Sequence, residues 1–307
     1  MLLLVDGGGT KTHVLITEDS GEYITDVKGG PLSFAVISKE EALRNLLSII
    51  NATISKLNRP DVIFSRALIG LAGVDTAEET SDANIFFAST LKTVVQGTVR
   101  VVNDSEIALA SGTNKQNAVV IISGTGSNCF GRNDMGQTAK SGGLDYLLSD
   151  EGSAYDIGLK ILKAAVMSAD GREEKTELED LVKNYFSVTE IAKLKQKVYA
   201  PGFNKASIAR ISLLLPQALE KNDNLALKIL DDAVESLVNM VRAVCINLHF
   251  EDQVFDLVAS GGMFSDAMIS VSRFSQSIKE EFPKAVIIRP QKPPVYGALN
   301  LLLGTAK

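Results

Sequence analysis

A strand that ends in a glycine-rich turn occurs twice in this chain, and no other sequence feature constrains its fold as strongly. The first copy is an apolar run that ends in DGGGTKT, and the second is the run 118–122 followed by SGTGSN. The two turns lie about 117 residues apart, counted from Gly8 to Thr125. Two halves that open in the same way predict a duplicated α/β protein in which each half presents its glycine turn to a shared cleft.

Apolar periodicity and capping residues predict the elements around these turns. Strands are expected at 2–5, 13–17, 23–27, 66–70, 99–102, 118–122, 254–259 and 285–289. Helices are expected at 39–57, 153–168, 188–197, 206–221, 224–248, 265–282 and, as an amphipathic terminal stretch, 295–303. Ser38 and Glu41 have the spacing of a capping box for the first of these helices.

Glycine-rich turns of this kind suit phosphate groups, because backbone N–H groups can point into the bend and no Cβ blocks the approach. The residues expected to bind a nucleotide are, in the two turns, Gly8, Gly9, Thr10, Lys11, Thr12, Gly124, Thr125 and Gly126. A Walker A loop is excluded because 13–17 is strand-like, and a Rossmann fingerprint is excluded because its third glycine is missing. A tight hairpin that binds no ligand is the alternative for each turn.

Two aspartates at strand ends are candidates for phosphoryl transfer, which needs Mg²⁺ to neutralise charge and an acceptor hydroxyl relieved of its proton. Asp6, at the end of the first strand, is placed to hold Mg²⁺ through water. Asp104, after the strand 99–102, can accept the proton of the hydroxyl as a general base. The alternatives are a simple turn residue for Asp6 and, for Asp104, an N-cap of a helix that starts near Glu106.

Asp150 and Glu151 directly precede the predicted helix 153–168. Acidic side chains stabilise the first turn of a helix, so helix capping is one interpretation of this pair. The other interpretation places the Asp150 carboxylate against sugar hydroxyls as a hydrogen-bond acceptor.

Composition limits the class of ligand and the compartment. The chain has 307 residues, of which 45% are hydrophobic, and this is enough for two domains with a core each. A net charge of −6 without a long basic block argues against nucleic acid, so we expect a small-molecule substrate. Cys129 and Cys245 lie outside any CxxC pattern, which argues against disulfides and thiolate metal sites and fits the cytoplasm. The apolar start MLLLV is too short to span a membrane.

Taken in order, the motifs resemble those of a known family. DGGGTKT looks like a first phosphate motif and ISGTGSNC like a second, with GLAGVD and Asn103-Asp104 between them. LSDEGSAYDIG is similar to a sugar-side signature, and ASGGMF is similar to an adenosine motif. On these residues nearly the whole chain resembles the N-acetylglucosamine kinase and BadF/BadG/BcrA/BcrD ATPase family, a hexokinase-like group of the actin-like ATPase superfamily.

The resemblance implies an α/β fold of two ribonuclease-H-like domains, of the actin and hexokinase type, with ATP and Mg²⁺ in the cleft between them. The expected domains are 1–112 and 113–294, the second with helical insertions, and a C-terminal helix at 295–307 can pack back on the first. Homodimers are common in the family, and one is expected here.

The resemblance also implies roles for single residues on the nucleotide side. Asp104 matches the base that activates the sugar hydroxyl, usually at the 6 position, and Thr10 and Thr125 match the hydroxyls of the phosphate loops. The adenosine turn and a segment lining the nucleotide are matched by Gly261, Gly262 and the stretch that starts at Ala206.

On the sugar side the chain departs from the family pattern. The residues at sugar-contacting positions are Gly142, Gly143, Leu144, Asp150 and, where the family commonly has an asparagine, Ser33. Where relatives often carry Gly-Gly-Trp-Gly or a similar run, Leu144 and Asp145 follow the two glycines. The missing aromatic ring and the added carboxylate favour an amino sugar over an acetamido sugar.

We therefore expect an ATP-dependent kinase that phosphorylates a hexosamine or hexose such as N-acetylglucosamine, glucosamine or glucose. Two other functions stay open. BadF-type relatives that activate a dehydratase or reductase hold an iron–sulfur cluster with interface cysteines, a pattern that Cys129 and Cys245 do not show. A catalytically silent sugar- or nucleotide-binding regulator would lack the base that Asp104 supplies.

Overall fold

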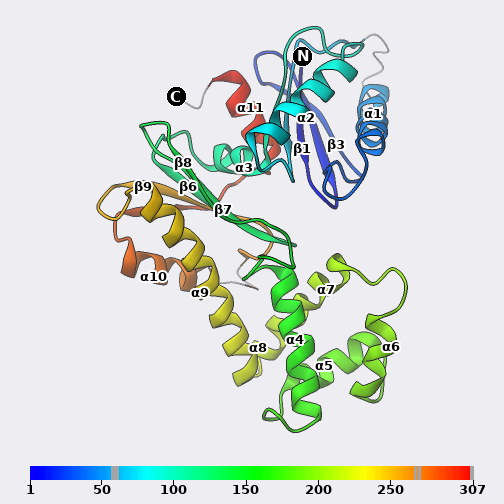
Figure 1. Cartoon of the computed structure of the whole chain (residues 1–307), viewed down its shortest axis with the longest axis vertical. Coiled ribbons are helices and arrows are strands. Elements are labelled where there is room, and N and C mark those ends of the chain that lie inside the picture. The colour runs from blue at the N-terminus through cyan, green and yellow to red at the C-terminus, as the bar shows by residue number, and fades with distance from the viewer. Residues whose placement is uncertain (57–61, 266–267, 269–270, 305–307) are drawn as a thin grey trace. The chain divides into compact units, whose positions relative to one another are not determined.

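The computed structural model describes residues 1–56, 62–265, 268 and 271–304, which form two compact units (Figure 1). The first unit comprises Met1–Ala118 and Ile288–Lys307, and the second comprises Val119–Ile287. Each carries a five-stranded sheet, so the prediction of a mixed α/β fold is confirmed. The predicted helix end at 57, the positions 266–267 and 269–270 of a later predicted helix, and 305–307 lie outside the described residues.

The sheet of the first unit has the strand order β3-β2-β1-β4-β5. Its strands are β1 (Leu2–Gly7), β2 (Thr12–Thr17), β3 (Tyr23–Gly29), β4 (Arg66–Leu71) and β5 (Val99–Asn103). β1 pairs antiparallel with β2, and β2 with β3, whereas β1, β4 and β5 run parallel to one another. Asp6 lies opposite Gly70, and Leu71 lies opposite Asn103. The carboxyl ends of β1, β4 and β5 therefore meet at one edge, the edge at which open α/β sheets bind ligands.

Alternation of side chains gives this sheet two buried faces. The helices of the unit are α1 (Lys39–Lys56), α2 (Ala77–Thr90), α3 (Asp104–Gly112) and α11 (Val295–Leu303). Leu3 and Val5 pack on one face with residues of α1 and α2, while Leu2 and Leu4 pack on the other with residues of α3 and α11. The red helix α11 lies beside α3 in Figure 1, although the two are far apart in the sequence.

The second unit has the strand order β10-β9-β6-β7-β8. Its strands are β6 (Ala118–Ser123), β7 (Ser127–Arg132), β8 (Thr138–Gly142), β9 (Phe255–Ser260) and β10 (Ala285–Ile288). Its helices are α4 (Ala154–Ala169), α5 (Glu177–Phe186), α6 (Leu194–Val198), α7 (Lys205–Ile211), α8 (Leu215–Leu219), α9 (Asn224–Asn247) and α10 (Val271–Glu281), with 3₁₀ turns at Ile191–Lys193 and Ser212–Leu214. One core joins the sheet to these helices, and α9 contacts β7, β8, α4 and α10 (Figure 1).

The largest differences from the predicted elements lie among the helices of the second unit. Helix α5 was not predicted, although Leu178 and Val182 form a buried stripe and Thr176 caps it by accepting from the N–H of Leu178. The helix predicted at 188–197 begins later, because Ser187 ends α5 in a left-handed conformation. The helix predicted at 206–221 is divided into α7, a 3₁₀ turn and α8. None of the helices within the described residues is long and apolar enough to cross a lipid bilayer.

Candidate functional site

The first glycine turn is held by backbone hydrogen bonds from two neighbouring motifs. The N–H of Gly8 donates to the carbonyl of Lys11 at 3.0 Å, and the carbonyl of Gly8 accepts from Leu32 at 3.0 Å. The carbonyl of Gly7 accepts from Ala72 at 2.9 Å. Leu32 belongs to GGPLSF and Ala72 to GLAGVD, so the fold brings both motifs to the first turn.

The hydroxyls of this turn differ in what they can reach. Thr10 and Lys11 are exposed, so both side chains are accessible to a ligand. Thr12 is fully buried in β2, and its Oγ1 donates to the carbonyl of Gly30 at 2.7 Å. A hydroxyl has one proton to donate, so donation by Thr12 to phosphate would require this bond to break, and its contact with phosphate stays a prediction.

Asp6 and Asp104 lie at the carboxyl edge of the first sheet, close enough for their charges to interact. Burial raises the pKa of Asp6, the negative charge of Asp104 raises it further, and Lys11 lowers it in part, which leaves a pKa of about 7. Two carboxylates in such a position favour a shared cation or a bound proton. Asp6 is therefore more than a turn residue.

Asn103, and not Asp104, is the N-cap of α3. The Asn103 side chain accepts from the N–H of Ser105 at 3.0 Å, and Glu106 completes a capping box with the backbone N–H of Asn103. Asp104 is the first residue of the helix, so its proposed role as N-cap is wrong. The helix N-terminus stabilises negative charge at Asp104 without using its carboxylate as the cap.

Ser33 lies buried against the same turn. Its N–H points to the carbonyl of Gly8 at 3.4 Å, and its Oγ accepts from the N–H of Ala35 at 3.3 Å. A Cβ on Gly73 would stand 2.9 Å from that Oγ, which shows how closely GLAGVD approaches. Ser33 therefore belongs to the assembly of motifs around the first turn, and its contact with sugar stays a prediction.

The second glycine turn is anchored on the N-terminus of α4. Within the turn, the N–H of Gly124 donates to the carbonyl of Gly126 at 2.9 Å. The carbonyls of Gly124 and Thr125 accept from Ala154 at 2.9 Å and from Tyr155 at 3.3 Å. Thr125 is exposed, and a Cβ on Gly124 would meet nothing within 4 Å. The outer side of this turn is therefore open.

The turn at Ser260–Gly262 packs against the strand end from which the second glycine turn starts. Gly261 has a φ of 107°, and a Cβ there would stand 2.2 Å from the carbonyl oxygen of Ser123. The same carbonyl accepts from the N–H of Met263 at 3.0 Å. A Cβ on Gly262 would meet no atom within 4 Å. The structure thus brings the adenosine-like motif and the second glycine turn together.

The side chain of Asp150 packs against the second glycine turn and binds its backbone. Its Oδ1 accepts from the N–H of Ser127 at 2.9 Å, and a Cβ on Gly126 would stand 2.7 Å from the same oxygen. Its Oδ2 pairs with Lys205 Nζ at 2.6 Å. The cap of α4 is Ser153, so the interpretation of Asp150 as its N-cap is wrong. Contact of Asp150 with sugar stays a prediction.

The loop that contains Gly142, Gly143 and Leu144 is joined to this assembly. The N–H of Gly143 donates to the carbonyl of Ser127 at 3.1 Å, and the side chain of Leu144 is exposed. Ala206 follows Lys205 at the start of α7, which packs closely on α4. Sequence reasoning missed Lys205, because nothing in its local sequence marks its partners.

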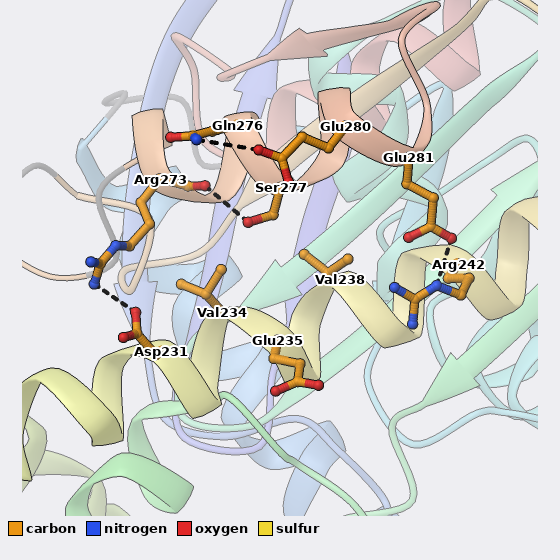
Figure 2. A pocket seen from close by; sticks show the side chains of 10 residues that line it. All are labelled: Asp231, Val234, Glu235, Val238, Arg242, Arg273, Gln276, Ser277, Glu280 and Glu281. Atoms are coloured by element: carbon orange, nitrogen blue, oxygen red, sulfur yellow. Dashed lines mark hydrogen bonds and ion pairs between the residues drawn. The ribbon is translucent and has the colours of Figure 1, made fainter.

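A large groove of the second unit lies elsewhere, between α9 and α10. It has a volume of about 720 Å³ and contains none of the predicted site residues. Figure 2 shows ion pairs Arg273–Asp231 and Arg242–Glu281 across it, with Val234 and Val238 on its floor. Because both arginines of this groove already pair with acids and none of the predicted site residues lines it, we do not assign the nucleotide to this groove.

The comparisons with known proteins agree with one family. A model of the BadF/BadG/BcrA/BcrD ATPase family matches residues 5–302. The chain is 35% identical to the N-acetylmuramic acid/N-acetylglucosamine kinase of Clostridium acetobutylicum, over 96% of this chain and 95% of that protein. It is 28% identical to the N-acetyl-D-glucosamine kinase of Dictyostelium discoideum, over 99% of this chain and 98% of that protein.

Solved structures agree with the fold. A candidate N-acetylglucosamine kinase from Chromobacterium violaceum superimposes with a TM-score of 0.73 at 21% identity, covering 98% of each chain. The family model and the 35% identical relative each extend over nearly the whole sequence. The chain therefore belongs to the BadF/BadG/BcrA/BcrD ATPase family.

Proposed function

We propose that this protein is an ATP-dependent sugar kinase that transfers the γ-phosphoryl group to the 6-hydroxyl of a hexosamine or hexose. The observation that carries the proposal is the pair Asp6 and Asp104 beside the first glycine turn, at the carboxyl edge of the first sheet. Family membership and the kinase names of the two relatives support it. N-acetylglucosamine, glucosamine and glucose are the first substrates to test.

Asp104 is the proposed general base. It would take the proton of the sugar hydroxyl as the oxygen attacks the γ-phosphorus, while ADP leaves. Its place as the first residue of α3 puts its carboxylate at the positive end of the helix dipole, which favours negative charge there. A positioned base contributes about 100- to 10,000-fold in rate.

The proposed nucleotide contacts come from both units. In the first unit they are Gly8, Gly9, Thr10, Lys11 and Thr12, and in the second they are Gly124, Thr125, Gly126, Ala206, Gly261 and Gly262. The exposed side chains of Thr10 and Thr125, and the open space beside Gly124 and Gly262, fit contacts with ATP.

Asp6 is the proposed holder of Mg²⁺, through water. Within the described residues, no group of three or more acidic, histidine or cysteine side chains is arranged to hold a metal ion. Mg²⁺ in kinases needs no such group, since one or two carboxylates and the substrate phosphates suffice. Burial and, after it, the negative charge of Asp104 raise the pKa of Asp6, and a bound Mg²⁺ would offset that repulsion and neutralise charge on the phosphates.

The proposed sugar contacts are Ser33, Asp104, Gly142, Gly143, Leu144 and Asp150. Apart from the small-molecule substrate we expect no nucleic-acid partner, and we expect a homodimer in the cytoplasm. The iron–sulfur alternative is disfavoured, because Cys129 and Cys245 are both buried in the core of the second unit, where neither can reach a partner subunit.

A coupled ADP-release assay with Mg-ATP and a panel of hexoses, hexosamines and N-acetylhexosamines tests the proposal. We expect sugar-dependent ADP release that Asp104→Asn slows by about 100- to 10,000-fold. Asp82→Asn, an exposed acid on α2 of the same unit, is the matched control. No sugar-dependent release by the wild-type protein over the whole panel would refute the proposal.

A further inference from the structure

The loop from Gly142 to Asp150 has an unusual backbone. Gly142 and Gly143 have φ values of 72° and 79°, and the non-glycine residues Asp145 and Asp150 have φ values of 67° and 78°. Side-chain-bearing residues rarely adopt this left-handed conformation, and they keep it only where their surroundings hold them in place. The structure must therefore supply an anchor at each of the two aspartates.

Lys205 is that anchor for both aspartates. Its Nζ pairs with Asp150 Oδ2 at 2.6 Å and also with Asp145 Oδ1. The ammonium group lies 5.7 Å from the ring centre of Tyr146, which in turn packs on Tyr155 with ring centres 5.0 Å apart. One cation on α7 thus contacts the loop at three places.

The charges of this cluster reinforce one another. Burial lowers the pKa of Lys205, but the two carboxylates raise it by more, so the lysine remains charged. Burial raises the pKa of Asp145, but the hydrogen bond from Lys205, a backbone hydrogen bond at Tyr146 and the charge of Lys205 together lower it by more. Removal of the lysine would take away the ion pair that its Nζ makes with each of the two carboxylates.

The anchored loop is also joined to the second glycine turn. Asp150 binds the N–H of Ser127, and Gly143 donates to the carbonyl of Ser127. Lys205 therefore acts, through Asp150, on a segment proposed to bind sugar and on a turn proposed to bind phosphate.

The loop holds apolar side chains in solvent. Leu147 and Leu148 are 81% and 75% exposed, and Leu144 is exposed as well. A slack loop would turn such side chains inward, since burial of apolar surface is favourable. The ion pairs of Asp145 and Asp150 with Lys205 hold the loop in a form that leaves Leu144 accessible to a ligand.

We propose that Lys205 is a positioning residue that fixes the 142–150 loop and thereby sets the affinity and selectivity for the sugar. The inference rests on the proposed kinase function. A loss of about 1 Å in positioning can cost about 100-fold in efficiency, so the effect should be large enough to measure.

Kinetics of Lys205→Met, Lys205→Arg and a control, Lys195→Met on exposed α6, test the role. For Lys205→Met we expect a sugar KM raised about 10- to 100-fold, a smaller rise in the KM for ATP, and kcat within a few-fold of wild type. Lys205→Arg should recover most of the sugar affinity, because arginine can pair with both carboxylates. An unchanged sugar KM in Lys205→Met, or no recovery by arginine, would overturn the proposal.

Limited digestion with chymotrypsin, without substrates, gives a readout independent of turnover. Cleavage after the leucines and Tyr146 of the loop should be about 10-fold faster in Lys205→Met than in wild type and Lys195→Met, because cleavage follows local opening. Exposed Tyr199 provides an internal reference site. Equal loop cleavage would overturn the proposal, whereas faster cleavage in a protein that lacks kinase activity would refute only the proposed function.

A second variant guards against misfolding of Lys205→Met. Asp145→Asn removes only the exposed partner and leaves the buried pair with Asp150. We expect the same direction of change in sugar KM and in loop cleavage, with a smaller size. No change in either measurement would contradict the anchoring role.

Discussion

Each unit places an acid beside a glycine turn, and the charges around the two acids differ. In the second unit, the Asp150 carboxylate pairs with Lys205 and accepts from Ser127, so its charge is compensated within the fold. In the first unit, Asp6 lies near a second acid, Asp104, and its pKa is raised to about 7. A carboxylate with a cationic partner can have a purely structural role. Two neighbouring carboxylates instead favour the binding of a cation or a proton.

The largest effect is expected for Asp104→Asn, which tests the role of the acid pair in the first unit. If Asp104 is the base, turnover falls about 100- to 10,000-fold while sugar KM changes little, because a proton acceptor acts mainly in the transition state. Steady-state kinetics beside the Asp82→Asn control measure this. Near-wild-type turnover of Asp104→Asn would show that Asp104 is not the general base.

In the second unit, Asp150→Asn should lower the stability of the protein. Its side chain is only 4% exposed, so losing the charge leaves Lys205 short of its buried partner, and the free energy of unfolding should fall by about 3 kcal/mol. Asp145→Asn removes a 66% exposed carboxylate and should cost less than about 1 kcal/mol. Urea denaturation separates the two, and equal losses would contradict the distinction between buried and exposed partners.

Asp6 should show the opposite pH behaviour from an acid in an ion pair. The folded state raises its pKa from 3.8 to about 7, so folding favours the protonated form and stability falls as pH rises between these values. Asp6→Asn should therefore be more stable than wild type at pH 8, by at most a few kcal/mol at about 1.4 kcal/mol per unit of pKa, and similar at pH 3.

Thermal melts at several pH values measure this dependence. Mg²⁺ should raise the melting temperature of the wild type at pH 8 more than that of Asp6→Asn. A pH profile that Asp6→Asn leaves unchanged would show that the acid pair is compensated after all.

The smallest expected effect separates two threonines of the first turn. Thr12→Val should cost about 1 kcal/mol of stability, through the lost bond to Gly30, and leave the KM for ATP unchanged. Thr10→Val should leave stability within about 0.5 kcal/mol and raise the KM for ATP. The reverse pattern would indicate that Thr12, and not Thr10, contacts the phosphates.

Much of the fold follows from local patterns in the sequence. The apolar run at 2–5 predicts a strand, and β1 is that strand, with Leu3 and Val5 packed on one face and Leu2 and Leu4 on the other. The strand ends before the glycine turns were predicted within two residues for both copies. Such features depend on neighbours along the chain, which the sequence displays directly.

Local patterns predict that a helix has a cap, but they do not always identify the capping residue. The spacing of Asn103 and Glu106 carries the capping-box signal, yet Asp104 next to it is an equally good cap by residue type. Backbone geometry decided between them. It left Asp104 without a capping role, which strengthens its candidacy as base.

Only the tertiary structure decided which polar groups remain accessible. The hydroxyl of Thr12 is taken up by Gly30 and that of Ser127 by the carbonyl of Glu151. Lys205 meets Asp145 across 60 residues of sequence. The sequence by itself determined the glycine turns, the acids and their order, because these are local. The pairing of Asp145 and Asp150 with Lys205 depended on contacts between distant segments, which no local pattern encodes.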